Sequence, residues 1–496
     1  MSQATAFAGY PSVVMYQGDG PDKPPKLTTA VQHLLWGDYL KIKSEKGSFY
    51  WVASRGEEGW VEKQSVQTKR LLEMVFVDVG QGDGCLIVTP DDKWFVVDAG
   101  VGDNLYRFLR WRFGRFQKPV AFEAAIISHP DEDHYGGFEA LFADTNVTFN
   151  TVYHNGIMER KGEGTTPSLG AQKKVGKVSL LTDIVRDHKQ LKAFLGEPAA
   201  WKGKAYATML DKALAAGRFP NSEMLWAGKE LPGYGQGADL VIQVLGPVLE
   251  PTGEGQGLRA FGSVGKTKNG HSIVLRLVYD KVSILIGGDL NIPAEQWLLG
   301  HHTGLPGKPK SLEDERLLVE AARRIFRCDV AKSCHHGSAD FSETYLKALD
   351  PIATVISSGD DEPHAHPRAD TLGAIGRWAR GGRPLIFSTE LARSAKEAVK
   401  SPYALRQQLR EAEKNKDNPE LSEAKRSKAA KEFDRLVDSI DRSIAVYGAI
   451  NLRTDGDKVV LAYKIENPRT KDRKWDIYQL ERTGEGPLTY SCKHEA

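Results

Sequence analysis

The alternation of apolar and polar positions divides the chain into a short β-rich beginning and a longer region where strands, loops and helices alternate. Residues 33–66 contain short apolar and aromatic runs separated by glycine-containing turns, which predicts a small antiparallel β unit. We place this unit at 1–70 and a second unit at 71–496. The second unit opens with three apolar runs, predicted as strands at 74–79, 85–89 and 94–99.

Several later strands end directly in polar or glycine-rich loops. The apolar strand predicted at 124–128 runs straight into a cluster of histidine and aspartate residues. Further strands are predicted at 239–246, 272–279 and 282–287, the last of which ends at Gly287–Asp289. Two more transitions from a strand to histidines follow the strands predicted at 329–333 and 353–359. Loops that follow such strands gather at one rim of a sheet, where ligands and catalytic groups collect. The pattern predicts a layered α/β fold with a functional site at that rim.

Two segments interrupt this alternation. An insertion near 155–238 contains helical patterns at 180–195 and 205–216 among many glycines and prolines. A second insertion near 395–440 is charge-rich and is predicted to form one or two helices broken near Pro419. Its mixed signs favour solvated helices over a nucleic-acid-binding surface.

Composition narrows the class of protein. The chain has 496 residues, of which 41% are hydrophobic and 27% charged, as in globular enzymes with more than one structural unit. A net charge of +2 gives no bulk argument for a nucleic-acid partner. The four cysteines lack CxxC spacing, which argues against a disulfide framework and favours a reducing cytoplasm. With neither a signal-peptide pattern nor a long apolar run, we expect a soluble protein without a membrane partner.

The strongest chemical signal is the run from His129 to His134, HPDEDH, which holds two imidazoles and three carboxylates. Imidazole nitrogens and carboxylate oxygens are ligands for Zn²⁺, Mn²⁺ or Fe²⁺. On an extended loop, the alternate positions His129, Asp131 and Asp133 can face one centre while His134 turns towards a second. The alternative is a polar turn in which Asp133 caps the helix that begins near Gly136.

This run resembles the metal motif of metallo-β-lactamase-fold hydrolases, with Asp131 at the place of the more common second histidine. Further motifs in one order resemble the hydrolase domain of the ComEC competence-protein family: Val77–Asp83, Val97–Gly100, Asn269–Ser272, Gly287–Asp289, His335–Ser338 and His364–Pro367. The resemblance extends from about Leu72 to Ile465. It implies an αββα sandwich with helical insertions, preceded by the small β-rich domain. That domain resembles a bacterial Src-homology-3-like barrel, the alternative being a β-rich extension packed on the main domain.

The resemblance also implies a ligand set for two divalent metal ions. His129 and Asp131 would bind one ion, and Asp133 and His134 the other. Asp289 would bridge the two ions.

Two coordination positions have alternatives. His335 would complete the shell of the second ion, in preference to His336. Asn269 stands where metallo-β-lactamases carry a histidine, and the nearby His271 is the alternative ligand. Asp98 matches the family's structural aspartate, which supports the metal loop without binding metal. The glycine-rich segment at 79–84 is expected to form a tight hairpin beneath the site, with Asp83 buttressing a ligand.

Asp131 makes the site more anionic than one with a further imidazole, which extends the expected metals from zinc to manganese and magnesium. His364 and His366 follow the last catalytic strand, where they can hydrogen-bond a phosphate oxygen or protonate a leaving alcohol. The alternative for this pair is a surface loop bounded by prolines. Together with Asp133 they are the candidate catalytic residues.

The resemblance implies a dinuclear metal-dependent phosphodiesterase, namely a nuclease in which a metal-activated hydroxide attacks the phosphorus of DNA or RNA, in DNA processing or antiphage defence. Nucleic acid is then the expected substrate, and a protein partner would bind the N-terminal module. One alternative is a metallo-hydrolase of a small ester, lactone or phosphoester. Another is a binding or scaffold protein that has lost activity.

Overall fold

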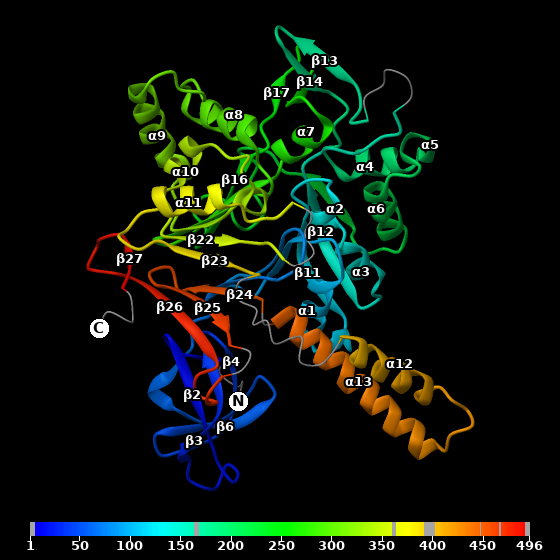
Figure 1. Cartoon of the computed structure of the whole chain (residues 1–496), viewed down its shortest axis with the longest axis vertical. Helices are drawn as coiled ribbons and strands as arrows, with labels where there is room; N and C mark the ends of the chain where they lie inside the picture. The colour runs from blue at the N-terminus through cyan, green and yellow to red at the C-terminus, as the bar shows by residue number, and fades with distance from the viewer. Residues whose placement is uncertain are drawn as a thin grey trace.

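The computed structural model describes residues 5–162, 168–359, 364–390, 402–446, 448–465 and 468–491. Within them, two large sheets lie face to face with helices on both outer faces, and a separate small sheet lies at the N-terminal end (Figure 1). This arrangement confirms the predicted αββα sandwich with a β-rich N-terminal part. No helix among these residues combines the length and the apolar character needed to cross a membrane.

The larger sheet combines strands from both ends of the second unit. Its described strands run in the order β15-β12-β11-β10-β9-β8-β24-β25-β26-β27. Their bounds are Leu72–Phe76 (β8), Gly84–Val88 (β9), Trp94–Ala99 (β10), Val120–Ile126 (β11), Val147–His154 (β12), Asn221–Met224 (β15), Ile450–Thr454 (β24), Val459–Lys464 (β25), Trp475–Arg482 (β26) and Leu488–Tyr490 (β27). β10, β11, β12 and β15 are parallel to one another. β8 and β9 are buried along their whole length, because both faces of the sheet are covered.

The second large sheet has the order β16-β19-β20-β21-β22-β23. Its strands span Leu240–Gly246 (β16), Val274–Tyr279 (β19), Val282–Ile286 (β20), Val330–Lys332 (β21), Ala353–Ile356 (β22) and Leu385–Ser388 (β23). From β20 to β23 the strands are parallel, so their carboxyl ends lie at one rim. The core between the two sheets consists of apolar side chains from both, including Met74, Phe76, Ile87, Ile242, Leu275 and Ile284.

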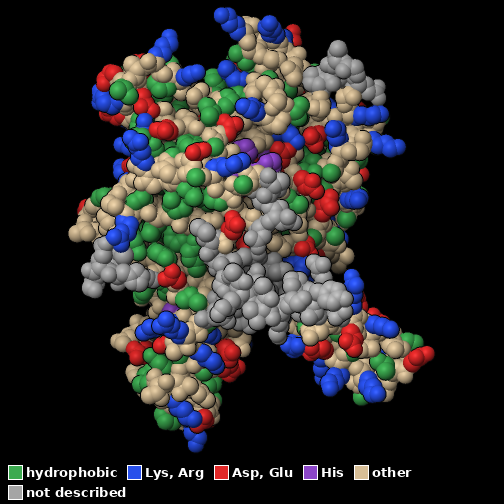
Figure 2. Space-filling model, in the orientation of Figure 1, with side chains coloured by type: hydrophobic (Ala, Val, Ile, Leu, Met, Phe, Trp, Pro, Cys, Tyr) green, Lys and Arg blue, Asp and Glu red, His purple; other side chains and the backbone are tan. Residues whose placement is uncertain are grey.

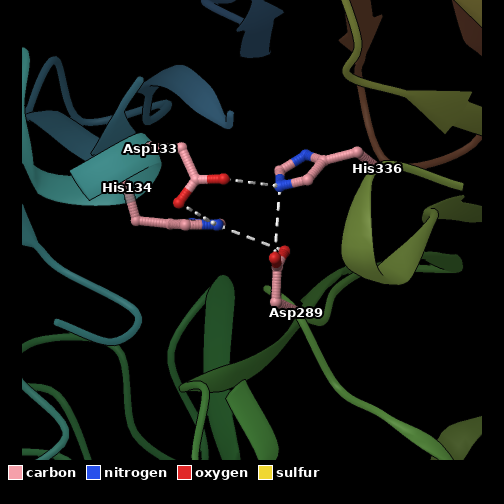
Figure 3. A group of neighbouring side chains, drawn as sticks. All are labelled: Asp133, His134, Asp289 and His336. Atoms are coloured by element: carbon pink, nitrogen blue, oxygen red, sulfur yellow. Dashed lines mark ion pairs between the residues drawn. The ribbon is translucent and has the colours of Figure 1, made fainter. Parts of the chain in front are cut away.

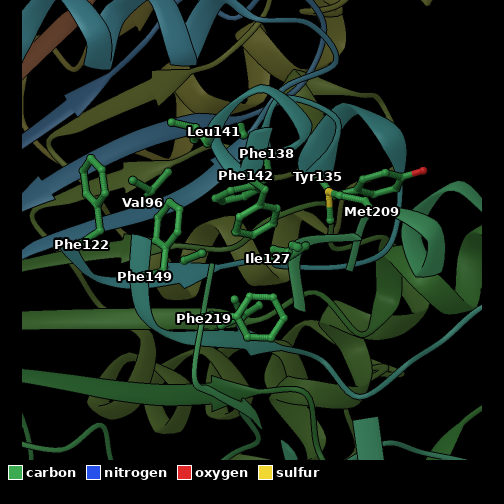
Figure 4. Close-up of a cluster of buried hydrophobic side chains, with 14 of the residues drawn as sticks. Val96, Phe122, Ile127, Tyr135, Phe138, Leu141, Phe142, Phe149, Met209 and Phe219 are labelled. Atoms are coloured by element: carbon green, nitrogen blue, oxygen red, sulfur yellow. The ribbon is translucent and has the colours of Figure 1, made fainter. Parts of the chain in front are cut away.

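Helices cover the outer faces. Next to the larger sheet lie α1 (Asn104–Arg112), α2 (Glu132–Tyr135), α3 (Phe138–Ala143), α4 (His188–Leu195), α5 (Pro198–Trp201) and α6 (Ala205–Ala215). Figure 4 shows the aromatic packing in this layer, where Phe138 and Phe142 from α3 meet Phe149 of β12 and Phe122 of β11 lies beside Phe149. On the other side lie α7 (Val264–Gly270), α8 (Ile292–Thr303), α9 (Leu312–Phe326), α10 (Glu343–Leu349) and α11 (Ala369–Trp378).

The first insertion differs in part from its prediction. The helix expected at 180–195 begins only at His188, because the Asp187 side chain accepts the Gln190 N–H and so caps that point. Leu180 and Leu181 instead belong to β14 (Val178–Leu181), which joins β13 (Gln172–Val175), β17 (Glu250–Pro251) and β18 (Gln256–Arg259) in a small sheet. The second expected helix is confirmed as α6.

The second insertion forms a helical hairpin that projects from the body (Figure 1). It consists of α12 (Pro402–Lys416) and α13 (Glu423–Val446), and the break between them contains Pro419, as predicted. α13 packs along α1. The first residues of the predicted segment, up to 401, lie outside the described residues.

The N-terminal sheet has the order β3-β2-β6-β5-β4-β1-β7. Its strands span Ala6–Ala8 (β1), Ser12–Gln17 (β2), Lys26–Leu35 (β3), Tyr39–Lys46 (β4), Phe49–Ser54 (β5), Glu57–Glu62 (β6) and Val66–Gln67 (β7). It has an apolar core of its own, which includes Val13, Met15, Val52 and Val61. A second apolar cluster, with Trp36 and Trp475, joins it to β25 and β26 of the larger sheet.

Candidate metal centre

The rim where the two large sheets meet brings together loops that are distant in sequence. β11 ends at Ile126 and leads into the HPDEDH run, whose last residues form the short helix α2. β20 ends at Ile286, just before Asp289, and β21 ends at Lys332, just before the two adjacent histidines His335 and His336. The polar loops predicted after these strands therefore meet at one place.

Four side chains form the larger of two groups of potential ligands among the described residues: Asp133, His134, Asp289 and His336. Figure 3 shows them pointing towards a common centre. Asp289 is central, since its two oxygens lie 3.2 Å from His134 Nε2 and 3.2 Å from His336 Nε2. Asp133 closes the ring, 3.6 Å from His336 Nε2 and 3.9 Å from His134 Nε2.

The donor atoms of this group fit a divalent cation. The Nε2 atoms of His134 and His336 and the Oδ1 atom of Asp289 are buried and have no hydrogen-bond partner. Burial works to raise the pKa of Asp289, but the imidazoles of His336 and His134 outweigh it and hold that pKa well below its usual range. The carboxylate is therefore charged, and two nitrogen and two oxygen ligands suit zinc or manganese.

His134 is oriented through Nδ1, the ring nitrogen that does not face the centre. Its Nδ1 atom lies 2.8 Å from Asp98 Oδ2, and the other oxygen of Asp98 accepts the Ser128 N–H at 2.7 Å. A carboxylate on Nδ1 fixes the ring orientation and leaves Nε2 directed at the centre. Asp98 thus occupies the supporting position expected from the sequence.

His336 is oriented by a buried ion pair between Asp83 and Lys332, of which only Asp83 was predicted from the sequence. Its Nδ1 atom lies 3.2 Å from Asp83 Oδ1, and the ammonium of Lys332 pairs with Asp83 Oδ2. Asp83 therefore buttresses a candidate ligand, as expected. Lys332 was not predicted to belong to the site, although a lysine at the end of an apolar strand just before adjacent histidines was a usable signal.

His335 was predicted as the metal ligand in preference to His336, but it is His336 that belongs to the four-residue group. His336 has 5% of its side chain exposed and belongs to the group, whereas His335 has 26% exposed and its Nε2 atom lies 3.9 Å from Asp289. Both residues have a left-handed backbone, with φ of 50° and 51°, in the tight turn at Cys334–Gly337. In this turn His336 points inward and His335 lines the mouth of the site.

His271, the alternative ligand, faces away from the centre. Its buried ring bonds the Arg259 carbonyl through Nε2 at 2.7 Å and packs on Phe261. Burial lowers the pKa of this imidazole to about 4. Asn269 lies at the site instead. Its amide nitrogen donates hydrogen bonds to Asp131 Oδ2 and to the Gly265 carbonyl, each at 2.9 Å.

His129 and Asp131 lie beside the four-residue group and not within it. His129 Nε2 is 3.4 Å from Asp131 Oδ2, and the ammonium of Lys268 pairs with Asp131 Oδ1. Burial works to lower the pKa of Lys268, but Asp131 and Glu159 outweigh it and keep the pKa above its usual value. Lys268 is therefore a charged neighbour of Asp131, at the oxygen that does not face His129.

The remaining candidates, His364 and His366, line the opening. The rings of His366 and His364 are 5.7 Å apart, and the His366 ring is 5.8 Å from that of His335. Both residues line a cavity of about 280 Å³ over the metal group. A second cavity of about 450 Å³ shares His335, His364 and His366 with the first and adds Arg368.

Comparisons with solved structures give matches of low identity. The metallo-beta-lactamase fold protein YhfI from Bacillus subtilis is 10% identical, with 64% of this chain and 96% of that chain covered and a TM-score of 0.31. Zn(2+)-bound PqqB from Methylobacterium extorquens is 8% identical, with 64% and 97% covered and a TM-score of 0.32. MEM-A1, a subclass B3 metallo-beta-lactamase from a soil metagenome library, is 13% identical, with 63% and 83% covered and a TM-score of 0.23.

No curated protein matches the sequence. The family model of the metallo-beta-lactamase superfamily matches residues 77–337, which is more than half of the chain. The matched range begins in the loop after β8 and ends just after His336, so it contains all four residues of the candidate metal group. The chain therefore belongs to the metallo-beta-lactamase superfamily, whose members are metal-dependent hydrolases.

Proposed function

We propose that this hydrolase is a phosphodiesterase, and specifically a nuclease acting on DNA or RNA. The observation that carries the proposal is the chemistry of the cavity over the metal group. All of its described lining residues are polar or charged: Gln81, Asp131, Glu132, Asp133, Asn269, Asp289, His335, His336, His364 and His366.

With a divalent ion bound to its carboxylates, such a lining would favour a strongly hydrated, anionic substrate over an apolar one. Small-molecule sites are usually lined mainly by apolar side chains, which provide most of the binding free energy. Here imidazoles at the mouth offer hydrogen bonds to phosphate oxygens. A phosphodiester has two such oxygens and little apolar surface next to the bond that breaks.

Substrate beyond the reacting group has room to extend. The adjoining cavity continues from the three shared histidines to Arg368 and Ser338. A guanidinium there is suited to a neighbouring phosphate, because it can donate two parallel hydrogen bonds. Figure 2 shows histidine side chains near the middle of one face, with lysine, arginine and acidic side chains around them. A polymer with regularly spaced phosphates fits two cavities that share lining residues better than a compact ester does.

The residues around the cavity would have different roles in hydrolysis, according to where they lie. Asp133, His134, Asp289 and His336 would hold the divalent ion, which when bound lowers the pKa of water and neutralises charge on the phosphoryl group. Gln81 lies against the site, with its amide 3.4 Å from Asp133 Oδ2. His335 and His364 are placed to hydrogen-bond the non-bridging oxygens. His366, whose ring is 5.8 Å from that of His335 and 6.3 Å from that of His336, would deliver a proton to the departing oxygen.

The test is a substrate panel with metal-loaded protein. We expect cleavage of single- or double-stranded DNA, RNA or bis(p-nitrophenyl) phosphate, and little turnover of p-nitrophenyl acetate or a lactone. The variant H366A should lose about 10²–10⁴-fold in kcat on nucleic acid. The same substitution at His301, an exposed histidine on α8, serves as the control. Hydrolysis of the carboxylic esters with no cleavage of any phosphodiester would overturn the proposal.

A further inference from the structure

A large cavity lies at the junction between the N-terminal sheet and the larger sheet, apart from the metal centre. Its volume is about 740 Å³, which is in the usual range for sites that bind small molecules. β4 and β5 line it from the N-terminal sheet, and β8, β10 and α1 line it from the second unit. Both units thus form this junction cavity.

The junction cavity lies at the opposite end of β10 from the metal centre. Trp94 begins β10 and lines the cavity, whereas Asp98, near the end of the same strand, supports His134. Along an extended strand, Trp94 and Asp98 are about 13 Å apart. The junction cavity and the cavity over the metal group share no described lining residue. A ligand in the junction cavity would therefore occupy a second site.

The lining of the junction cavity carries an excess of positive charge. Its cationic side chains are Lys41, Arg55, Arg70, Arg112 and Arg453, and its acidic ones are Asp38 and Glu73. Arg70 also pairs at 2.7 Å with Asp92, which is not a lining residue. Even with this carboxylate included, the cations outnumber the anions, so the cavity favours an anionic ligand.

Two of the guanidinium groups have N–H donors to spare. The Arg112 side chain is 24% exposed, and among the described residues its guanidinium hydrogen-bonds only Glu73, through Nη2 at 2.9 Å. The Arg70 side chain is 26% exposed and directs its Nη2 at Asp92. A guanidinium has five N–H donors, so each of these two groups can also bond a ligand.

The charges around Arg112 are not fully balanced. Burial lowers the pKa of Arg112, and the guanidinium groups of Arg453 and Arg55 lower it further, against the opposite effect of Glu73. A negative charge placed nearby favours the charged form of such a group. An anion in the junction cavity would therefore reduce the repulsion among these guanidinium groups.

Aromatic rings form much of the remaining lining of the junction cavity: Phe7, Tyr39, Trp94, Trp111 and Phe113. Trp94 and Trp111 are only partly buried, and Tyr39 is 52% exposed. The Arg70 guanidinium lies over the Phe7 ring, 5.5 Å from its centroid, so cations and rings are already interleaved. Bases of nucleic acids stack on aromatic side chains, and guanidinium groups bind phosphate through paired hydrogen bonds.

We propose that the junction cavity is a second binding site that takes a nucleotide, with its phosphate on Lys41 and the guanidinium groups and its base against Trp94 and Trp111. A free mononucleotide and one nucleotide of a nucleic-acid strand present the same two groups, and the experiment separates these sources. The proposal depends neither on the metal group nor on the reaction proposed for it.

Equilibrium binding to the full chain tests this second site. In the presence of a metal chelator, the chain is titrated with AMP, with inorganic phosphate and with a short oligoadenylate, and binding is followed by calorimetry. We expect one AMP per chain and weaker binding of inorganic phosphate. Tighter binding of the oligoadenylate than of AMP would identify a strand as the source of the nucleotide. Equal or weaker binding would identify a free nucleotide, and either result supports the site.

Two variants place the ligand in the junction cavity. K41E reverses a charge of the lining and should weaken AMP binding at least about tenfold. Its control K43E lies on the same strand but outside the lining and should bind AMP normally. W111L removes a ring and should also weaken AMP binding about tenfold. W226L, which removes a partly buried tryptophan outside the lining, is the control.

Four results would overturn the proposal. They are no binding of AMP or oligoadenylate to the unmodified chain, binding of inorganic phosphate as tight as that of AMP, and normal AMP binding by K41E or by W111L. If W111L does not fold, K41E and the comparison of AMP with phosphate still decide. Because no measurement uses turnover, failure to cleave any phosphodiester while AMP binds would overturn the proposed function alone.

Discussion

Arg453 donates a hydrogen bond to Asp38 Oδ1 at 2.7 Å, across the junction between the N-terminal sheet and the larger sheet. Both side chains are almost completely buried, with exposed fractions of 2% and 3%. Arg453 also pairs with Glu73, and Asp38 pairs with Arg55. Burial works to raise the pKa of Asp38, but the two guanidinium groups outweigh it and hold the pKa far below its usual value. The junction is therefore a charge network as well as an apolar contact.

Replacing Arg453 with methionine should destabilise the protein strongly. The substitution leaves Asp38 and Glu73 buried without one of their cations, and breaking one side of a buried ion pair costs about 3–5 kcal/mol. Urea unfolding of R453M measures the change in the free energy of unfolding. R435M, on the exposed face of α13, is the control and should unfold like the unmodified chain. Similar midpoints for the two variants would show that the network does not stabilise the junction.

The pairing of Asp98 with His134 predicts a selective effect on metal affinity. D98N keeps the shape of the side chain but removes the charge that orients His134, so affinity should fall about 10–100-fold. Mn²⁺ or Zn²⁺ titration measures this. D280N, at an exposed turn between β19 and β20, is the matched control. An unchanged affinity in D98N would mean that the ring is oriented by other contacts.

Gly82, in the glycine-rich segment at 79–84, lies where a side chain would collide with the backbone of Asp133. Gly82 has φ of 107°, and a Cβ atom there would lie 1.8 Å from the carbonyl oxygen of Asp133. G82A should therefore displace the loop that carries Asp133 and abolish metal binding, even where circular dichroism shows a folded protein. Gly102 has open space around its Cβ position, so G102A should bind metal normally. Normal binding by G82A would contradict the close approach seen here.

The buried carboxyl of Glu295 should make the free energy of unfolding depend on pH. This carboxyl on α8 is fully buried, and burial raises its pKa well above the usual 4.5. The folded state therefore holds a proton that the unfolded state releases. The resulting contribution to stability is fully present below about pH 4.5 and is lost as the pH rises towards the folded-state pKa.

E295Q keeps a hydrogen-bond acceptor for the Ser342 N–H and removes the titration. It should be more stable than the unmodified chain at pH 8, with the difference shrinking towards pH 4. Thermal unfolding across this range is the measurement, and E320Q on the exposed face of α9 is the control. A difference that grows as the pH falls would contradict the assigned direction.

The parts of the molecule predicted well from sequence are those with strong local patterns. β8, β9 and β10 are short apolar runs separated by glycine- and proline-containing segments, and each lies within a few residues of its expected place. The HPDEDH run was visible because so many ligand-type side chains follow an apolar strand. The helix expected at 180–195 was misplaced because Leu180 and Leu181 pair with β18, a partner far along the chain that local periodicity does not reveal.

The details of the site depended on geometry that a sequence pattern does not contain. Which of two adjacent histidines points inward is decided by the left-handed turn at Cys334–Gly337. Lys268 stands in a polar segment, KTKNG, that reads as an ordinary surface helix. Only the folded chain brings it to Asp131, 137 positions away.

The position of β24 has a consequence for the order in which the protein is made. β8 pairs with β9 on one side and with β24 on the other, so that Leu72 lies opposite Thr454. A ribosome synthesises Leu72 long before Thr454, and during that interval β8 has an open edge. Unpaired strand edges can associate with other chains. Newly made chains should therefore depend on chaperones until β24 has been synthesised, and a protein cut short before β24 should aggregate even though it contains every candidate metal ligand.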